Sequence, residues 1–216
     1  MENITNELLE FIGMYIGDGS IYKSNNSFIF ELRGNLDEKE FYEKYVTNLL
    51  LKIYQGKYKI GYRSGGKRGC FGIRITNQAF IKKILSLGFF AGRKSHTIKI
   101  PEKMLELSIE QQKYLVRGLV STDGSAYLAK INKSEVKNYP MIEYSSVSKE
   151  LVLQVQNILK KLKIKSYFWT YNSKKDSPQH YIRVCGIKEC EKFFRIIGLS
   201  NYKHKNALKS IINKNI

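Results

Sequence analysis

The fold of this chain is decided by a stretch that occurs twice: FIGMYIGDGSIY at residues 11–22 and VRGLVSTDGSAY at residues 116–127. Gly, Asp, Gly, Ser and Tyr recur in the two copies at one constant offset of 105 positions, which is the distance from Gly13 to Gly118. A period of about half the chain indicates a duplicated domain, because solenoid repeats are only about 20–50 residues long.

The similarity between the halves extends beyond this motif. The triplet IRI at residues 73–75 returns as IRV at residues 182–184. The offset there is slightly larger, so small insertions separate the copies. We therefore predict an N-terminal half over residues 1–106 and a C-terminal half over residues 107–216.

Each half shows the same predicted order of elements, α-β-β-α-β-β-α. Helical spacing of apolar residues and period-two alternation distinguish the helices from the strands. The expected elements are helices at about 5–17, 37–54, 109–122 and 148–163, strands at about 28–33 and 141–146, hairpins at about 57–64 with 70–76 and 165–172 with 180–186, and short helices that end at Gly88 and Gly198. Hairpins joined across a helix favour an α+β fold with two pseudo-symmetric αββαββα halves, each a four-stranded antiparallel sheet backed by helices.

Residues at the helix ends give further expectations. Asp37, Ser108 and Ser148 stand where an N-cap would accept a backbone hydrogen bond. The glycine of each Asp-Gly pair is expected to end its helix in the left-handed conformation.

The chain is strongly basic. Its 216 residues include 37 Lys and Arg against 19 Asp and Glu, which gives a formal net charge of +18. A domain this basic usually binds a polyanion. Aromatic residues make up 12% and there are only three prolines, so we expect the charge to lie on a folded body.

Several classes of protein are disfavoured by composition. Cys70, Cys185 and Cys190 are odd in number and contain no CxxC, so we expect reduced core residues. The three histidines are scattered, which argues against a histidine-rich metal site. No apolar run is long enough for a membrane helix and the N-terminus lacks the layout of a signal peptide. We therefore expect an intracellular protein, in a prokaryotic cytoplasm or an organelle, with no membrane partner.

Small residues mark one face of the helix in each motif. Gly13 and Gly17 lie four positions apart, and Gly118 and Thr122 occupy the matching positions of the second copy. Small residues at this spacing let two helix backbones approach closely. If the copies pack in parallel through these faces, their C-terminal ends meet and the following acids, Asp18 and Asp123, lie side by side.

This placement of two carboxylates is unfavourable unless something compensates it. Each acid is at the negative end of a helix dipole and faces the other. Hard divalent cations resolve the conflict, with oxygen ligands from Asp18 and Asp123, from the nearby backbone carbonyls of Gly17 and Thr122, and from a DNA phosphate; Mg²⁺ is the usual ion. Two such metals activate water and stabilise the leaving oxygen in phosphodiester hydrolysis.

The segments 11–19 and 116–124 resemble the two motifs of a single-chain LAGLIDADG homing endonuclease. The resemblance implies a pseudo-twofold monomer that cuts both strands of a long, asymmetric double-stranded DNA site and leaves 3′ overhangs. It implies that Asp18 and Asp123 bind Mg²⁺, that Mn²⁺ substitutes for it, and that Ca²⁺ supports binding without cleavage. At the sixth motif position, where the family name has Asp, this chain has Ile16 and Ser121, at a site that varies widely in the family.

The resemblance also implies peripheral basic or amide groups around the scissile phosphates. Lys94 and Lys203 follow the last short helix of each half and are the predicted catalytic lysines. The alignment is ambiguous by one residue, because counting from the preceding glycines pairs Lys94 with His204. At the end of the second strand, Asn35 is the candidate.

A sheet backed by helices leaves one face open, and strands alternate faces. A β-ribbon fits the major groove, where Arg reads guanine. The predicted DNA-binding residues lie on this face or on two basic hairpin loops: Arg33, Asn35, Arg63, Arg74 and Arg183 on the strands, and Lys67, Arg68, Lys174 and Lys175 in the loops.

Two other functions stay open at this point. The same fold can serve as an RNA-binding maturase for the intron that encodes it, which would make that intron RNA a partner. It can also serve as a non-catalytic, sequence-specific DNA-binding protein. The presence of both acids favours cleavage.

Overall fold

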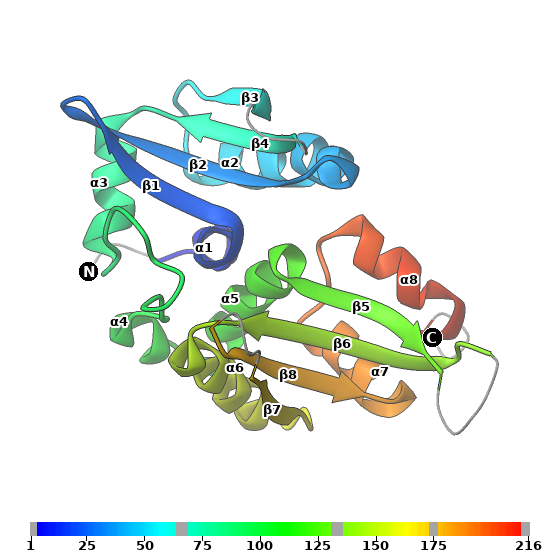
Figure 1. Ribbon diagram of the computed structural model, residues 1–216. Coiled ribbons are helices and arrows are strands. Elements are labelled where there is room, and N and C mark those ends of the chain that lie inside the picture. Colours follow the sequence, from blue (N-terminus) through cyan, green and yellow to red (C-terminus); the bar gives the residue numbers. More distant parts are fainter. Residues whose placement is uncertain (1–3, 64–68, 131–135, 173–176, 213–216) are drawn as a thin grey trace.

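The computed structural model describes residues 4–63, 69–130, 136–172 and 177–212 of the chain (Figure 1). Four residues predicted to contact DNA, Lys67, Arg68, Lys174 and Lys175, lie outside this part. Within it, no helix is both long and apolar enough to cross a bilayer. The three cysteines are free thiols.

The two halves repeat one order of elements. The first half consists of α1 (Asn6–Asp18), β1 (Gly19–Ser24), β2 (Ser27–Asn35), the 3₁₀ turn η1 (Leu36–Glu38), the π-helical turn η2 (Phe41–Val46), α2 (Thr47–Ile53), β3 (Lys59–Arg63), β4 (Cys70–Ile75), α3 (Gln78–Ser86) and α4 (Glu102–Leu105). The second half consists of α5 (Ile109–Thr122), β5 (Gly124–Ala129), β6 (Tyr139–Ser146), α6 (Lys149–Lys161), β7 (Tyr167–Tyr171), β8 (Gln179–Cys185), α7 (Ile187–Ile196) and α8 (Tyr202–Ile212). Helix α8, which packs on β5, was not predicted.

Each half contains one four-stranded antiparallel sheet, with strand orders β1-β2-β4-β3 and β5-β6-β8-β7. The register places apolar residues in pairs on the helix side, for example Leu32 opposite Ile73 and Ile142 opposite Val184. All four of these side chains are buried. The predicted α+β fold, with two halves built from sheets backed by helices, is therefore confirmed.

Helices α1 and α5 lie side by side between the two sheets (Figure 1). They touch through glycine: a Cβ atom on Gly13 would lie 2.3 Å from the carbonyl oxygen of Leu115, and one on Gly118 would lie 2.1 Å from the carbonyl oxygen of Glu10. Real Cβ atoms do not approach a backbone atom this closely, so any side chain at these two positions forces the helices apart.

A buried polar cluster adds a second link between the halves. The carboxylate of Glu10, on α1, accepts hydrogen bonds from the hydroxyls of Tyr45, at 2.7 Å, and Ser200. The guanidinium of Arg117, on α5, lies 3.5 Å from the same carboxylate. Because Glu10 is buried, the partners from both halves offset the cost of burying its charge.

Three expectations about the helices were wrong. The segment 37–54, expected to be one helix, is divided into η1, η2 and α2. The N-cap position before η1 is occupied by Asn35 and not by Asp37. Ser108 stands at the N-cap of α5, but its side chain makes no capping hydrogen bond. Ser148 does cap α6, accepting from the backbone N–H of Leu151 at 3.3 Å.

The glycines that follow the two acids are needed for space. Gly19 has φ −80° and ψ 156°, so the left-handed conformation expected there was wrong. A Cβ atom on Gly19 would lie 2.5 Å from the carbonyl oxygen of Tyr15, and one on Gly124 would lie 2.4 Å from that of Val120. The chain turns directly from helix into strand at both places, and only glycine fits the turn.

Candidate active site at the ends of the paired helices

Asp18 is the last residue of α1, and Asp123 follows the last residue of α5. A Cβ atom on Gly17 would lie 3.2 Å from the carboxyl carbon of Asp123, so this carboxyl group rests against the backbone just before Asp18. The hydroxyl of Thr122 packs against the same glycine, 2.3 Å from that Cβ position. The close contact of the helices therefore places the two acids together.

The electrostatics of this position disfavour two negative charges. Burial, followed by repulsion from Asp123 and Glu38, raises the pKa of Asp18 to about 8. Burial also raises the pKa of the Asp123 carboxyl, although one side of the residue is open to solvent. In the protein alone the pair therefore holds less than two full negative charges at neutral pH, and an arriving cation would favour its full ionisation.

A tyrosine that the sequence did not single out orients one of the acids. The hydroxyl of Tyr42 donates a hydrogen bond to Oδ2 of Asp18 at 3.2 Å. Tyr42 is fully buried and lies on the π-helical turn η2. Burial and the nearby carboxylates raise the pKa of Tyr42 well above its usual value, so the hydroxyl keeps its proton and acts as a donor.

Glu38 and Asn201 form a further buried pair beside the acids. One carboxylate oxygen of Glu38 accepts from the backbone N–H of Asn35 at 3.1 Å, and the other accepts from the side-chain amide of Asn201 at 2.7 Å. The same amide nitrogen donates to the carbonyl oxygen of Ser121 at 3.0 Å. This pair ties the end of α5 to the first half, and neither residue was predicted for the site.

Lys94 reaches the same place from the segment after α3. Its Nζ donates to the carbonyl oxygens of Ile16, at 2.5 Å, and Gly17, at 3.1 Å, and lies 5.3 Å from the centre of the Tyr15 ring. Burial lowers the pKa of Lys94 to about 8, while attraction to the nearby carboxylates opposes that shift. A predicted catalytic lysine thus lies with the acids.

Lys203 does not occupy the equivalent place. Its Nζ lies 2.7 Å from Asp37 at the surface, and more than half of its side chain is exposed. In the repeat Ser121 matches Ile16, and the carbonyl of Ser121 is bound by Asn201. Asn201 in the second half therefore makes the type of contact that Lys94 makes in the first. His204 is buried next to these residues along the chain, and burial lowers its pKa to about 4.

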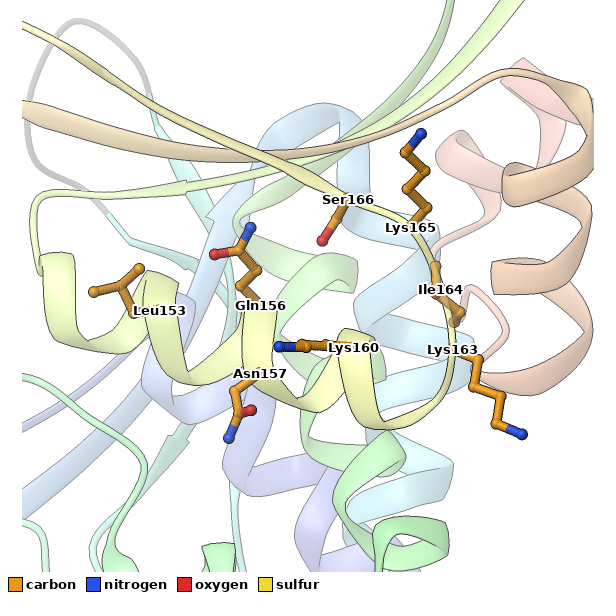
Figure 2. Close-up of a pocket in the computed structure, with 8 residues that line it drawn as sticks. All are labelled: Leu153, Gln156, Asn157, Lys160, Lys163, Ile164, Lys165 and Ser166. Atoms are coloured by element: carbon orange, nitrogen blue, oxygen red, sulfur yellow. The ribbon is translucent and has the colours of Figure 1, made fainter.

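A pocket of about 280 Å³ opens beside Asp123 and extends from the helix ends to the second sheet. Its lining consists of Ile16, Gly17, Lys94, Ser95, Ile98, Asp123, Ser145, Ser146, Val147, Leu151 and Gln179. Another pocket, of about 520 Å³, lies beside α6 and the turn that follows it; Lys160 comes from the helix, and Lys163 and Lys165 come from the turn (Figure 2). It shares no residue with the pocket at the acids.

The donor set at the helix ends fits a hard divalent cation held partly by substrate. In the described part of the chain, no three His, Cys, Asp or Glu residues group to hold a metal. Asp18 and Asp123 supply carboxylate oxygens, and the carbonyl of Gly17, which accepts one hydrogen bond from Lys94, keeps a second lone pair. Mg²⁺ commonly takes one or two carboxylates and completes its shell with water and phosphate oxygens.

The structure places the predicted DNA-contacting arginines on the open faces of the sheets. Arg33 donates to the carbonyl of Gly61 at 3.0 Å and to Glu31 at 3.3 Å. Arg74 lies opposite Glu31 in the register. Asn35 is exposed at the end of β2, and only the position of Arg63 as the last residue of β3 is described. Arg183, on β8, is bound to Glu143 at 2.5 Å. Their contact with DNA stays a prediction.

The chain resembles known proteins over most of its length. Residues 110–198 match the LAGLIDADG-like domain. The homing endonuclease I-DmoI in complex with DNA and Ca superposes with a TM-score of 0.62 at 16% identity, covering 91% of each chain. I-LtrWI bound to target DNA superposes with a TM-score of 0.61 at 15% identity, covering 99% of this chain and 91% of that one.

Curated proteins also match in sequence. Among them are the tRNA-splicing ligase RtcB of Pyrococcus furiosus, 23% identical over 95% of this chain, and the replicative DNA helicase DnaB of Rhodothermus marinus, 26% identical over 96% of it. This chain spans about a fifth of the length of each.

These matches define the class: the whole chain has the fold of the single-chain, two-domain LAGLIDADG homing endonucleases. Residues 110–198 match the LAGLIDADG-like domain, and the first half repeats the motif and topology of that segment.

Proposed function

We propose that this chain is a site-specific endonuclease that uses divalent metal to cut both strands of a long DNA duplex. The observation that carries the proposal is the pair Asp18 and Asp123, held together at the ends of α1 and α5 by glycine contacts. Support comes from the fold, which this chain shares with homing endonucleases bound to their target DNA. Both acids come from one chain, so we propose that a monomer is sufficient.

Each residue of the candidate site would have a distinct role. Asp18 and Asp123 would hold the cation, with the carbonyls of Gly17 and Thr122 as additional oxygen donors. A divalent cation bound there supplies activation of water and stabilisation of the leaving oxygen. Tyr42 fixes the orientation of Asp18 by its hydrogen bond. Lys94 keeps its charge next to both acids, where it would face a phosphate oxygen.

The curated relatives support a function separate from theirs. A ligase and a helicase share this segment, which makes up about a fifth of each. A segment found in two proteins with such different names is expected to have a function of its own, and the residues described above are the candidates for it.

The test uses a library of random-sequence DNA duplexes. Duplexes retained by the protein in Ca²⁺ are recovered and then incubated with the protein in Mg²⁺ or Mn²⁺. We expect double-strand breaks in Mg²⁺ and Mn²⁺ only. The variants Asp18→Asn and Asp123→Asn should retain binding and lose cleavage by at least a hundredfold. Glu150→Gln makes the same change of carboxylate to amide at an exposed acid outside the candidate metal ligands and serves as the control.

Two results would contradict the proposal: no cleavage of any retained duplex in Mg²⁺, or normal cleavage by both acid variants. Retention of single-stranded RNA in place of duplex DNA would favour the RNA-binding alternative. If the native protein and both variants bind the duplexes and none of them cuts, the result would favour a DNA-binding protein without catalysis.

A further inference from the structure

The open faces of the two sheets differ in chemistry. On the first sheet, the register groups Tyr22, Glu31, Arg33, Lys59 and Arg74 on the side opposite the buried apolar residues. Three of these five carry positive charge, and only Tyr22 is aromatic. Because strands alternate faces, these side chains share one surface. The first face is therefore basic.

The second face is aromatic and carries no net charge. Six of its residues are aromatic: Tyr127, Tyr139, Tyr167, Trp169, Tyr171 and Tyr181. Within strands β5 to β8, the only charged side chains on this face are Arg183 and Glu143, and they are bound to each other at 2.5 Å. Tyr167 and Tyr171 are 50% and 61% exposed, so aromatic surface is available to a partner.

The centre of this face is a packed stack. The ring of Trp169 lies parallel to that of Tyr181, with 4.9 Å between centroids, and the guanidinium of Arg183 lies 4.3 Å from the Trp169 centroid. Protein groups therefore already pack on the indole, and a nucleobase has little π surface left to stack on there. The stack instead forms a well-packed, largely apolar surface.

The second face is continuous with the candidate active site. Strand β5 begins directly after Asp123, and Ser145 and Gln179, which belong to this face, line the pocket that also contains Asp123 and Lys94. A duplex with its scissile phosphates at the acids must therefore extend over this face. The occupant to consider is DNA, and this step rests on the proposed function.

The chemistry of the face selects one feature of a duplex. A face with no net charge neutralises few phosphates, so it gains little from backbone contacts. Bases in a duplex stay stacked and offer only their edges in the major groove, where the thymine C5-methyl group is the apolar feature. We propose that the face of β5 to β8 reads a thymine-rich half-site through thymine methyl groups, whereas the basic face of β1 to β4 binds its half-site mainly by charge and hydrogen bonds.

The test starts from the duplexes retained from the random library in Ca²⁺. Thymine is replaced by uracil, which lacks the C5-methyl group, in one half-site at a time, and the dissociation constant is measured. Loss of one buried methyl contact should weaken binding about fourfold. We expect this penalty in one half-site only. In the double variant Tyr167→Ser with Tyr171→Ser it should disappear, and in the control Tyr22→Ser it should persist.

The outcomes separate this inference from the proposed function. If no duplex is enriched at all, the proposed function fails and this inference fails with it. If duplexes are enriched and cut, but uracil has no effect in either half-site or the penalty survives in the double variant, only this inference is overturned. If the double variant instead loses binding to single-stranded oligothymidine while duplex binding stays native, the face stacks unpaired bases and the inference is also overturned.

Discussion

Replacement of Gly118 by alanine tests whether the contact between the helices sets the geometry of the site. The added Cβ atom would lie 2.1 Å from the carbonyl oxygen of Glu10 and 2.8 Å from the backbone nitrogen of Met14. An ordinary contact is about 3.5 Å or more, so the helices must separate by roughly 1 Å. Backbone atoms form the obstacle, and no side-chain rotation can remove it.

Two effects of opposite sign compete in Gly118→Ala. Alanine favours a helix over glycine by about 1 kcal/mol. Overpacking of a close contact costs about 1–3 kcal/mol, and occasionally more, and the contacts along α1 and α5 that depend on the same spacing weaken as well. We expect the steric effect to prevail, with a net loss of about 2 kcal/mol in the free energy of unfolding. Cleavage should fall further, because the separation also moves Asp123 from Asp18.

The assay is urea denaturation followed by circular dichroism, with Gly17→Ala as the matched variant. The Cβ atom of Gly17→Ala would meet chiefly the hydroxyl of Thr122, a side-chain group that can rotate away. We expect Gly17→Ala to retain most of the native stability. A Gly118→Ala protein as stable as the native one, or more stable, would show that propensity outweighs the clash and would refute the reasoning.

Three further predictions concern side chains of the site. Tyr42→Phe removes the hydrogen bond to Asp18 and should slow cleavage about tenfold with no change in the circular dichroism spectrum; a native rate would show that Asp18 needs no such orientation. Lys94→Met should abolish cleavage in single-turnover assays and leave binding in Ca²⁺ within about threefold, whereas equal loss of both would assign Lys94 a structural role. Burial lowers the pKa of His204 to about 4, below the unfolded value of about 6.5, so the unfolded state binds a proton at a higher pH than the folded state. The free energy of unfolding should therefore be highest above pH 6.5 and fall by up to about 3 kcal/mol as pH falls towards 4. Urea denaturation of the native protein and of His204→Gln at pH 7 and 4.5 measures this loss. If the free energy of unfolding falls equally in both proteins, His204 is not its source.

Much of the fold was predictable because each sequence pattern occurs in both halves of the chain. A lone Asp-Gly-Ser marks only a turn, but two copies at a constant offset after helical glycines predict two paired helices. The alternation of apolar residues then predicts the strands, and the register found in β2 with β4 and in β6 with β8 follows it. These signals are local or periodic, so one sequence is sufficient to detect them.

The missed features depend on tertiary contacts. The π-helical turn η2 brings Tyr42 to Asp18, and helical spacing alone reads the segment as one regular helix. The pairing of Glu38 with Asn201 joins residues 163 positions apart and has no local signature. The distance from the preceding glycine aligned Lys94 with His204, whereas residue type aligned it with Lys203. In space, Asn201 makes the equivalent contact.

The two halves share a fold and differ at the site. The carbonyl of Ile16 is bound by the ammonium of Lys94, and the matching carbonyl of Ser121 is bound by the neutral amide of Asn201, which also binds Glu38. At this position the first half therefore contributes a positive charge, and the second half contributes a neutral amide that binds the buried carboxyl of Glu38 from the first half. The same division continues on the sheets, where one open face is basic and the other is aromatic. We therefore expect a duplex bound across both halves to meet different electrostatics in its two half-sites, which favours an asymmetric target.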